Sequence, residues 1–389
     1  MTNQKTVQLK GITWDHTRGF TSMVATAQRF HELHPEVEIE WSKRSLQAFA
    51  DEPIDQLAQR FDLLVIDHPW TGFAARTGVI EPLELLLPSE LLQNLAENSV
   101  GKSHESYRYN NQQWALAIDA ATPVAASRPD LLESRGEQLP QTWDDLLELA
   151  EKGGVAIPGI PQDTLMSFYM LCSTLGEDFC TTREYVVSEE IGNQSLSILR
   201  ELGKHINREC YDWNPIKVYE AMTQSDGYVY SPFAYGYANY SQEGYARKLL
   251  HFHNTVSIDG QNLITTLGGT GLAISSHCKN KSWAARYAEY VADPVTQKTF
   301  YVNFGGQPGH REAWLDDTNN KRLANYFKNT LPTLDQAFLR PRYAGHMYFQ
   351  DRAGAPIREF MIHGGNSELL LNELNRLYQE SLEQGIVEN

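Results

Sequence analysis

The sequence predicts an α/β protein built from two lobes, and two observations lead to this prediction. The chain has 389 residues, which is too long for one ordinary hydrophobic core. Its first part alternates strand-like and helix-like segments, as in Val7 to Trp14, Phe20 to His34 and Phe61 to Ile66. Such alternation favours an open, parallel sheet. Ligands of such sheets lie beyond the carboxyl ends of the strands.

Each segment rests on a periodicity or on a signal at its end. Phe20 to His34 has apolar residues at helical spacing and stops before Pro35. Leu46 to Arg60 has the pattern of a helix broken near Pro53. Thr142 is expected to cap a helix that starts at Trp143. The other expected elements are strands at 37–41 and 155–158 and helices at 164–175, 193–206, 214–223 and 367–383.

Composition and charge exclude several classes of protein. Hydrophobic residues make up 41% and charged residues 21% of the chain, as in a globular protein. The net charge of −16 argues against nucleic acid and against anionic membrane surfaces as partners. The longest apolar runs are far shorter than a membrane span. The four cysteines have no CxxC spacing, which argues against a zinc site, and whether Cys172 and Cys180 pair stays open.

A glycine-rich turn at Gly268, Gly269 and Gly271 precedes a short apolar strand and a helix. Glycines with Thr270 among them expose backbone N–H groups and let the backbone come close to a ligand. No Lys-Ser or Lys-Thr follows, so the turn is no phosphate-binding P-loop, and Ile274 stands where a dinucleotide fingerprint needs its third glycine. A plain turn of small residues is the alternative interpretation.

Polar clusters follow two of the predicted strands. Trp14, Asp15, His16 and Arg18 follow the first, and Asp67, His68 and Trp70 follow the strand that ends at Ile66. Both clusters would lie at the carboxyl edge of the sheet and reach a ligand site. Alternatively, Asp15 caps the helix near Phe20 and Asp67 holds its own turn.

Several segments, in order along the chain, resemble bacterial extracellular solute-binding proteins, in the maltose-binding-protein-like branch of ABC importers. The similar segments are FDLLVIDHPW, YRYNNQQWALAIDAATPVAASRP, PQTWDDLL, GGTGLAISSHCKNKSWAARYAEYVADPVTQKTF and GGQPGHREAW. The resemblance covers roughly residues 7 to 385. Ala126 and Ser127 depart from the Tyr-Asn pair that is usual in the family.

The resemblance implies a two-lobed periplasmic-binding-protein fold with hinge strands and a ligand cleft between the lobes. In chain terms, lobe 1 would be 1–119 plus 268–314, lobe 2 would be 122–264 plus 330–389, and the hinge crossings would lie near 119–122, 265–267 and 315–329. Ligand binding would close such a hinge, because only the closed state touches the ligand from both lobes.

The implied function is that of the substrate-binding component of an ABC transporter, which captures a small polar solute, with a carbohydrate expected first. Membrane permease subunits would be its partners, and it would act as a monomer without cofactor. Two alternatives stay open: a binding protein for an anionic organic solute (a carboxylate, a sulfonate or an acidic sugar), or a cytoplasmic ligand sensor with the same fold.

An enzyme is not expected. The sequence has no Gly-x-Ser-x-Gly elbow. His31 and His34 are three residues apart rather than four, which does not fit a zincin helix. His251 and His253 lack an acidic or cysteine partner at ligand spacing, so no metal site is predicted.

The predicted ligand-binding set combines groups that suit a sugar with groups that suit an anion. Aromatic faces stack on sugars and carboxylates accept their hydroxyl groups, whereas an arginine fork binds a carboxylate or a sulfonate. The set is Trp14, Asp15, His16, Arg18, Arg44, Asp67, His68, Trp70, Asp119, Phe233, Tyr235, Gly268, Gly269, Thr270, Gln307 and Arg342. For the aromatic stretch around Phe233, packing in a core is the alternative.

The location depends on the start of the chain. MTNQKTVQLKGITWDH has no basic region followed by an apolar one, as a secretory signal would. The expectation is a periplasmic or cell-surface protein if a signal peptide has been removed, and a cytoplasmic one if Met1 is the native start.

Overall fold

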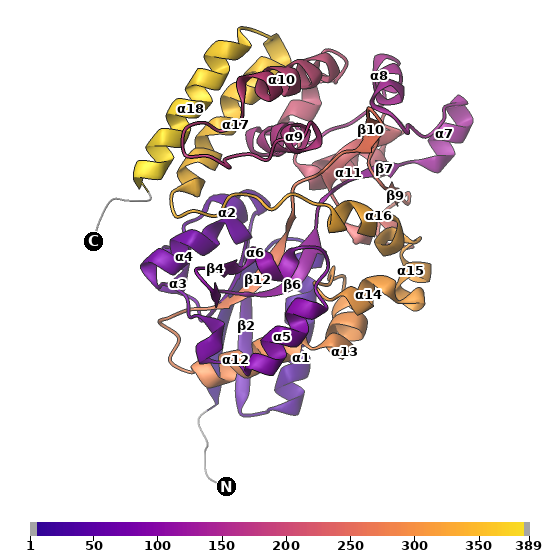
Figure 1. Cartoon of the computed structure of the whole chain (residues 1–389). Helices are drawn as coiled ribbons and strands as arrows, with labels where there is room; N and C mark the ends of the chain where they lie inside the picture. The colour runs from indigo at the N-terminus through magenta and orange to yellow at the C-terminus, as the bar shows by residue number, and fades with distance from the viewer. Residues whose placement is uncertain (1–5, 385–389) are drawn as a thin grey trace. The chain divides into compact units, whose positions relative to one another are not determined.

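The computed structural model describes residues 6–384, which form two compact units (Figure 1). Unit 1 takes its described residues from 6–120, 268–319 and 342–344. Unit 2 takes them from 121–267, 320–341 and 345–384. The chain therefore passes from one unit to the other at 120/121, 267/268, 319/320, 341/342 and 344/345.

Unit 1 is built on a five-stranded sheet in the order β2-β1-β3-β12-β6. The strands are β1 (Val7–Trp14), β2 (Val37–Arg44), β3 (Leu63–Ile66), β6 (Leu116–Ala121, whose last residue is in unit 2) and β12 (Gly268–Ile274). β1 is parallel to β2 and to β3, as the alternation of strands and helices predicts.

The prediction of a wholly parallel sheet is wrong, because β12 is antiparallel to β3, with Gly271 opposite Ile66. β12 starts where the chain enters unit 1 at 267/268, at the edge of the sheet where β3 ends. It therefore has to run in the opposite direction to β3. The next strand is β6, and Gly269 lies against the carbonyl of Asp119 while Gly271 lies against Ala115. β6 thus runs antiparallel to β12 and ends at this same edge.

Helices α1 and α12 pack against each other in the core of unit 1. Phe30 of α1 meets Tyr287 of α12 edge to face, with ring centroids 5.4 Å apart. The helices of this unit are η1 (Thr17–Thr21), α1 (Ser22–Leu33), α2 (Leu46–Asp51), α3 (Ile54–Ala58), η2 (His68–Trp70), α4 (Thr71–Thr77), η3 (Leu83–Leu85), α5 (Ser89–Glu97), α6 (Ser103–Ser106), α12 (Lys281–Ala292), α13 (Pro294–Thr296), η6 (Gln297–Tyr301), α14 (Arg311–Leu315) and the start of α15 (Asp317–Arg322). The hairpin of β4 (Arg108–Tyr109) and β5 (Gln112–Gln113) turns at Asn110 and Asn111, which both have positive φ, as a tight hairpin turn requires.

Unit 2 contains the three-stranded sheet β8-β7-β9 and a group of helices around α9. Its strands are β7 (Pro123–Ser127), β8 (Tyr230–Tyr235), β9 (His251–His253) and the pair β10 (Ser257–Ile258) and β11 (Gln261–Asn262). Its helices are α7 (Pro129–Arg135), α8 (Trp143–Glu151), α9 (Pro161–Thr174), α10 (Glu189–Gly203), η4 (Arg208–Asp212), α11 (Pro215–Gln224), η5 (Ala238–Ser241), α16 (Tyr326–Asp335), α17 (His346–His363) and α18 (Ser367–Gln384). α9 packs against α10 and α17, and α18 covers α17 (Figure 1).

Two local predictions for unit 2 need correction. The expected strand at 155–158 is only a bridge between Val155 and Tyr230. The expected helix at 193–206 starts earlier, at Glu189, because Ser188 caps it by accepting a hydrogen bond from the N–H of Ile191 (3.5 Å).

The segment Arg342–Ala344 belongs to unit 1, although the resemblance to the family implies lobe 2 for 330–389. The guanidinium of Arg342 donates to the backbone carbonyls of Glu105 (2.6 Å), Ser106 (3.1 Å) and Arg108 (2.9 Å). A Cβ on Gly72 would lie 1.8 Å from the carbonyl oxygen of Arg342, so α4 touches this segment directly. These contacts fix the segment on unit 1.

The predicted cap of α8 is present, and its removal gives a first testable result. The hydroxyl of Thr142 accepts from the N–H of Asp145 (3.2 Å), and the Asp145 carboxylate accepts from the N–H of Thr142 (2.9 Å). Thr142→Ala is expected to lower the free energy of unfolding by about 1 kcal/mol, because it leaves a helix N–H without its acceptor. Urea denaturation measures this loss. Thr142→Ser keeps the hydroxyl and should be close to the parent, and an equal loss in both variants would contradict the capping role.

Cys172, Cys180, Cys210 and Cys278 are free thiols, so the question of a pair between Cys172 and Cys180 is answered in the negative for this structure. Within 6–384, no group of three or more His, Cys, Asp or Glu side chains is arranged to hold a metal ion. Among the same residues, no helix has the length and apolar character that a membrane crossing needs.

Candidate functional site

The first polar cluster follows β1, and its members differ in their surroundings. Trp14 is buried in the core of unit 1, with its ring centroid 5.4 Å from that of Phe49. Asp15 is exposed and pairs with Lys43 (2.8 Å). His16 caps η1, since its Nδ1 accepts from the N–H of Arg18 (3.0 Å). Burial and, to a lesser extent, Arg18 lower the pKa of His16 to about 3, so its ring is neutral at pH 7.

Arg18 of η1 and Asp119 of β6 form a buried ion pair in unit 1. The Nε of Arg18 donates to one carboxylate oxygen of Asp119 (2.8 Å), and Nη2 donates to the other. Arg18 is 3% exposed and Asp119 1%. Both carboxylate oxygens and two guanidinium nitrogens are therefore used within the protein. Burial raises the pKa of Asp119, and the charge of Arg18 opposes that shift.

The second polar cluster, at the end of β3, holds its own turn. The Asp67 carboxylate accepts from the N–H of His68 (2.9 Å) and lies 3.3 Å from its Nδ1. Trp70 is 5% exposed and contacts Phe73, with ring centroids 5.5 Å apart. The alternative interpretation, in which Asp67 supports the turn, thus describes the contacts seen here.

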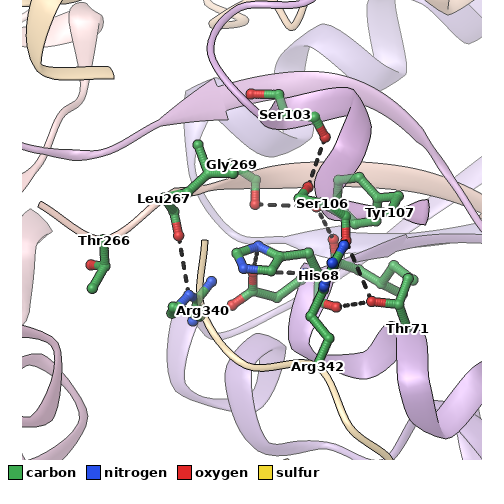
Figure 2. A network of polar contacts seen from close by, with 12 residues as sticks. His68, Thr71, Ser103, Ser106, Tyr107, Thr266, Leu267, Gly269, Arg340 and Arg342 are labelled. Atoms are coloured by element: carbon green, nitrogen blue, oxygen red, sulfur yellow. Dashed lines mark hydrogen bonds and ion pairs between the residues drawn. The ribbon is translucent and has the colours of Figure 1, made fainter. Parts of the chain in front are cut away.

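Figure 2 shows polar contacts around His68 in unit 1. The hydroxyl of Thr71 donates to the His68 carbonyl. The hydroxyl of Tyr107 donates to the carbonyls of Ile66 (3.1 Å) and Gly269 (3.5 Å), so it joins the end of β3 to the start of β12. This network fixes the edge of the sheet at which the polar clusters lie.

The prediction of a turn at the glycines is wrong, because Gly268, Gly269 and Gly271 already belong to strand β12, whose start comes very close to the end of β6. Gly269 has φ +96°, and a Cβ there would lie 2.3 Å from the Asp119 carbonyl oxygen. The side chain of Gln307 is fully buried and donates to the carbonyl of Ala120 (2.7 Å), while the N–H of Ala120 donates to the carbonyl of Gln307 (3.0 Å). In this structure Gly269 and Gln307 therefore hold strand β6.

Two of the predicted arginines are used for local structure. Arg44 donates to the carbonyl of Ala48 (3.0 Å) and pairs with Glu52 (3.3 Å). Arg342 binds the three carbonyls described above.

In unit 2, β8 carries both predicted residues. Phe233 is 2% exposed and stacks on Trp143, with the ring planes 8° apart and the centroids separated by 6.4 Å. The hydroxyl of Tyr235 hydrogen-bonds that of Thr266 (2.8 Å). Both residues also line a small hollow of unit 2, with a volume of about 10 Å³, enough for about one water molecule.

Asp163 lines the same hollow and is absent from the predicted set. It lies in the first turn of α9, is 7% exposed, and none of the described residues donates a hydrogen bond to its carboxylate. Burial raises its pKa to about 7. In the sequence, Asp163 directly precedes a segment that is almost wholly apolar or small, from Thr164 to Ser173.

Several buried polar atoms at the edge of the sheet in unit 1 have no protein partner among the described residues. They include the indole N–H groups of Trp14 and Trp70, the hydroxyl of Thr270 and the Nε of Arg44. A buried polar group without a hydrogen bond costs about 1–3 kcal/mol. The structure thus brings most of the predicted residues of unit 1 to one edge of its sheet, while Arg44 and Asp15 serve ion pairs of their own.

The sequence of the chain is similar to that of a known protein family and of one of its relatives. A family profile described as bacterial extracellular solute-binding protein matches residues 25–322. A maltotriose-binding protein of Pyrococcus abyssi (strain GE5 / Orsay) is 26% identical over 126 residues, or 32% of this chain. That match spans only about a quarter (26%) of the relative's length.

Solved structures resemble the whole chain. Maltose-bound MalE3 of T. maritima superposes with a TM-score of 0.82 at 18% identity, covering 96% of this chain and 99% of that one. A solute-binding protein of an ABC transporter from Agrobacterium radiobacter K84, in complex with ribitol, has a TM-score of 0.80 at 15% identity, covering 96% and 98%. The GacH receptor of Streptomyces glaucescens GLA.O has a TM-score of 0.79 at 15% identity, covering 97% and 99%.

Such low identities show the fold alone, and they confirm the predicted class, an α/β protein with the two-lobed periplasmic-binding-protein fold. The family profile covers well over half of the chain, which confirms the resemblance found in the sequence. The chain belongs to the family of bacterial extracellular solute-binding proteins.

Proposed function

We propose that the chain is the substrate-binding component of an ABC importer and that its ligand is a neutral carbohydrate. The ligands of similar proteins support the class of ligand, since they include maltotriose, maltose and ribitol. The proposal includes action outside the cytoplasmic membrane, as a monomer, together with permease subunits. It also includes the absence of catalysis, because the family is a class of binding proteins.

One observation carries the choice of a neutral ligand: two of the three predicted arginines already pair with carboxylates within the protein. Arg18 is paired with Asp119 and Arg44 with Glu52, whereas Arg342 donates to three neutral carbonyls. His16 is neutral at pH 7 because burial lowers its pKa to about 3. An anion would need a cation whose charge is still available, and breaking a buried ion pair to supply one costs about 3–5 kcal/mol.

The groups that remain available suit a polyhydroxyl molecule. The N–H groups of Trp14 and Trp70 can each donate to a hydroxyl oxygen, and the hydroxyl of Thr270 can donate or accept. In unit 2, the carboxylate of Asp163 can accept from sugar hydroxyls, and Tyr235 beside it, which is partly exposed, offers aromatic surface. A sugar would satisfy polar atoms that the protein leaves without partners.

Binding of carbohydrates is the direct test. Maltotriose, maltose, ribitol and mannitol would be titrated by calorimetry, with citrate and glucuronate as anionic comparisons. At least one neutral compound is expected to bind, with an affinity that does not change between 20 mM and 500 mM salt, since no free charge pair forms. Tight binding of an anion that weakens with salt, and none of a neutral compound, would contradict the proposal.

Trp70→Ala is expected to weaken binding of that carbohydrate about thirtyfold, or about 2 kcal/mol, because a buried aromatic anchor and its N–H are lost. Trp283→Ala serves as the matched control, since Trp283 lies on α12 against Phe30 and Arg286. An equal effect of both variants would show that Trp70 acts only through stability. Hinge closure stays a prediction, which a smaller radius of gyration on addition of the sugar would support.

A further inference from the structure

The carboxyl group of Asp163 lies in surroundings that disfavour a charge. It is 7% exposed and lines the hollow of unit 2 together with Met166, Met170 and Phe233. The two prolines Pro123 and Pro158 also line it, and neither has a backbone N–H to donate. Within 121–267, 320–341 and 345–384, no side chain or backbone N–H donates to the Asp163 carboxylate.

No opposite charge compensates this carboxyl group either. Tyr235 of β8 is the one other titratable residue that lines the hollow, and β7 contributes only Pro123. α10 and α17 pack against α9 but contribute no residue to the lining. Arg358 of α17 is the cation near the start of α9, and it donates to the carbonyls of Gly159 and Tyr211 (both 3.1 Å). The hydroxyl of Ser167 is directed at the backbone carbonyl of Asp163 (3.0 Å).

We propose that Asp163 holds a proton while the hollow is empty and releases it when a polyhydroxyl solute binds, so that a rise in pH strengthens binding. This inference rests on the proposed function, in which the ligand is a neutral carbohydrate. It concerns the regulation of the site by pH.

The chemistry follows from hydrogen bonding to an isolated carboxyl group. Without a donor or a cation, a buried carboxyl group is more stable neutral than ionised. Burial alone raises the pKa of Asp163 to about 7, with no contribution from a charged neighbour. When sugar hydroxyls donate to both oxygens, the ionised form gains hydrogen bonds that favour it. The O–H bond of the acid then breaks, and the proton leaves to the buffer.

The first part of the proposal, that Asp163 holds a proton in the empty protein, can be tested without a ligand. In the ligand-free protein, carbon-13 NMR of the aspartate carboxyl groups should show a signal that titrates near pH 7 and is absent from Asp163→Asn. The native state then binds a proton between pH 4 and 7 that the unfolded chain does not. The free energy of unfolding of the parent, relative to that of Asp163→Asn, should therefore be highest below pH 4 and fall as the pH rises to 7. A titration near pH 4 would overturn the proposal.

Calorimetry with maltotriose, or with the neutral carbohydrate that binds in its place, tests the second half. Affinity should rise about tenfold per pH unit between pH 5 and 7 and become constant above pH 8, with about 0.9 proton released per ligand at pH 6. Asp163→Asn should bind more weakly, without pH dependence and without proton release. Asp144→Asn, an exposed aspartate in the first turn of α8, should behave as the parent does.

The possible failures are distinct. If no neutral carbohydrate binds, the proposed function fails, and the NMR titration still decides whether Asp163 is protonated in the empty protein. If a carbohydrate binds with the same affinity from pH 5 to 8 and without proton release, the proposed function stands and the proton release is refuted. Affinity that falls as the pH rises would likewise refute it, because Asp163 would then act as a donor.

Discussion

Asp119→Ala is expected to lower the free energy of unfolding by about 4 kcal/mol. The reason is that Arg18, which is 3% exposed, would keep its charge in the core of unit 1 and lose both hydrogen bonds to its carboxylate partner. A buried ion pair contributes little in itself, whereas one half of it left alone is costly. Urea denaturation followed by circular dichroism measures the loss.

Asp15→Ala is the matched control for this prediction. It removes an aspartate from an ion pair with Lys43 in which both side chains are about half exposed (48% and 55%), so the expected change is below about 0.5 kcal/mol. The double variant Arg18→Met with Asp119→Leu should recover most of the loss, because it removes both charges. A loss in the double variant as large as in Asp119→Ala would mean that shape, rather than charge, decides the stability here.

Gly269→Ala is expected to cost about 3 kcal/mol of unfolding free energy. A Cβ at this position would lie 2.3 Å from the carbonyl oxygen of Asp119 and 2.7 Å from the Cα of Ala120, and backbone atoms cannot rotate away as a side chain does. The φ of +96° adds strain for any residue with a side chain. The strands β12 and β6 would have to separate, and the midpoint of thermal or urea unfolding reports that change.

Gly260→Ala separates the two causes. Gly260 has a similar φ of +81°, and a Cβ there would meet nothing within 4 Å. Its loss should therefore be only about 1 kcal/mol, from the backbone alone. If both substitutions lower the free energy of unfolding by the same amount, the close approach of Gly269 to β6 does not contribute to the loss.

The sequence predicts those elements of the fold whose signals are local. Thr142 and Asp145 carry the capping box within four residues, and Asn110 with Asn111 carries the hairpin turn in two. The direction of β12 is not local, since it depends on which edge of the sheet the chain enters after leaving unit 2. Helix α17 was not predicted, and Pro356 inside it is a residue that normally indicates the end of a helix.

For the site, the sequence predicts where polar residues gather but not how they pair. Arg18 and Asp119 are 101 positions apart, so nothing in the sequence shows that each neutralises the other. Both were predicted as ligand contacts, and their pairing changes the expected charge of the ligand from undecided to neutral. Asp163 is absent from the predicted set because nothing in its sequence context indicates burial. It resembles an ordinary acidic residue in the first turn of a helix, and only the folded chain shows that it is buried.

The position of β12 also determines the order in which the protein can be completed during synthesis. β12 lies between β3 and β6 in the sheet, yet it follows β3 by some two hundred residues, as the pairing of Gly271 with Ile66 shows. A nascent chain shorter than 268 residues therefore exposes an unpaired edge of β3, and β6 has no strand beside it in the sheet. Pairing across so large a separation is slow, and free strand edges promote aggregation. The sheet of unit 1 therefore cannot be completed until the chain beyond residue 268 has been made.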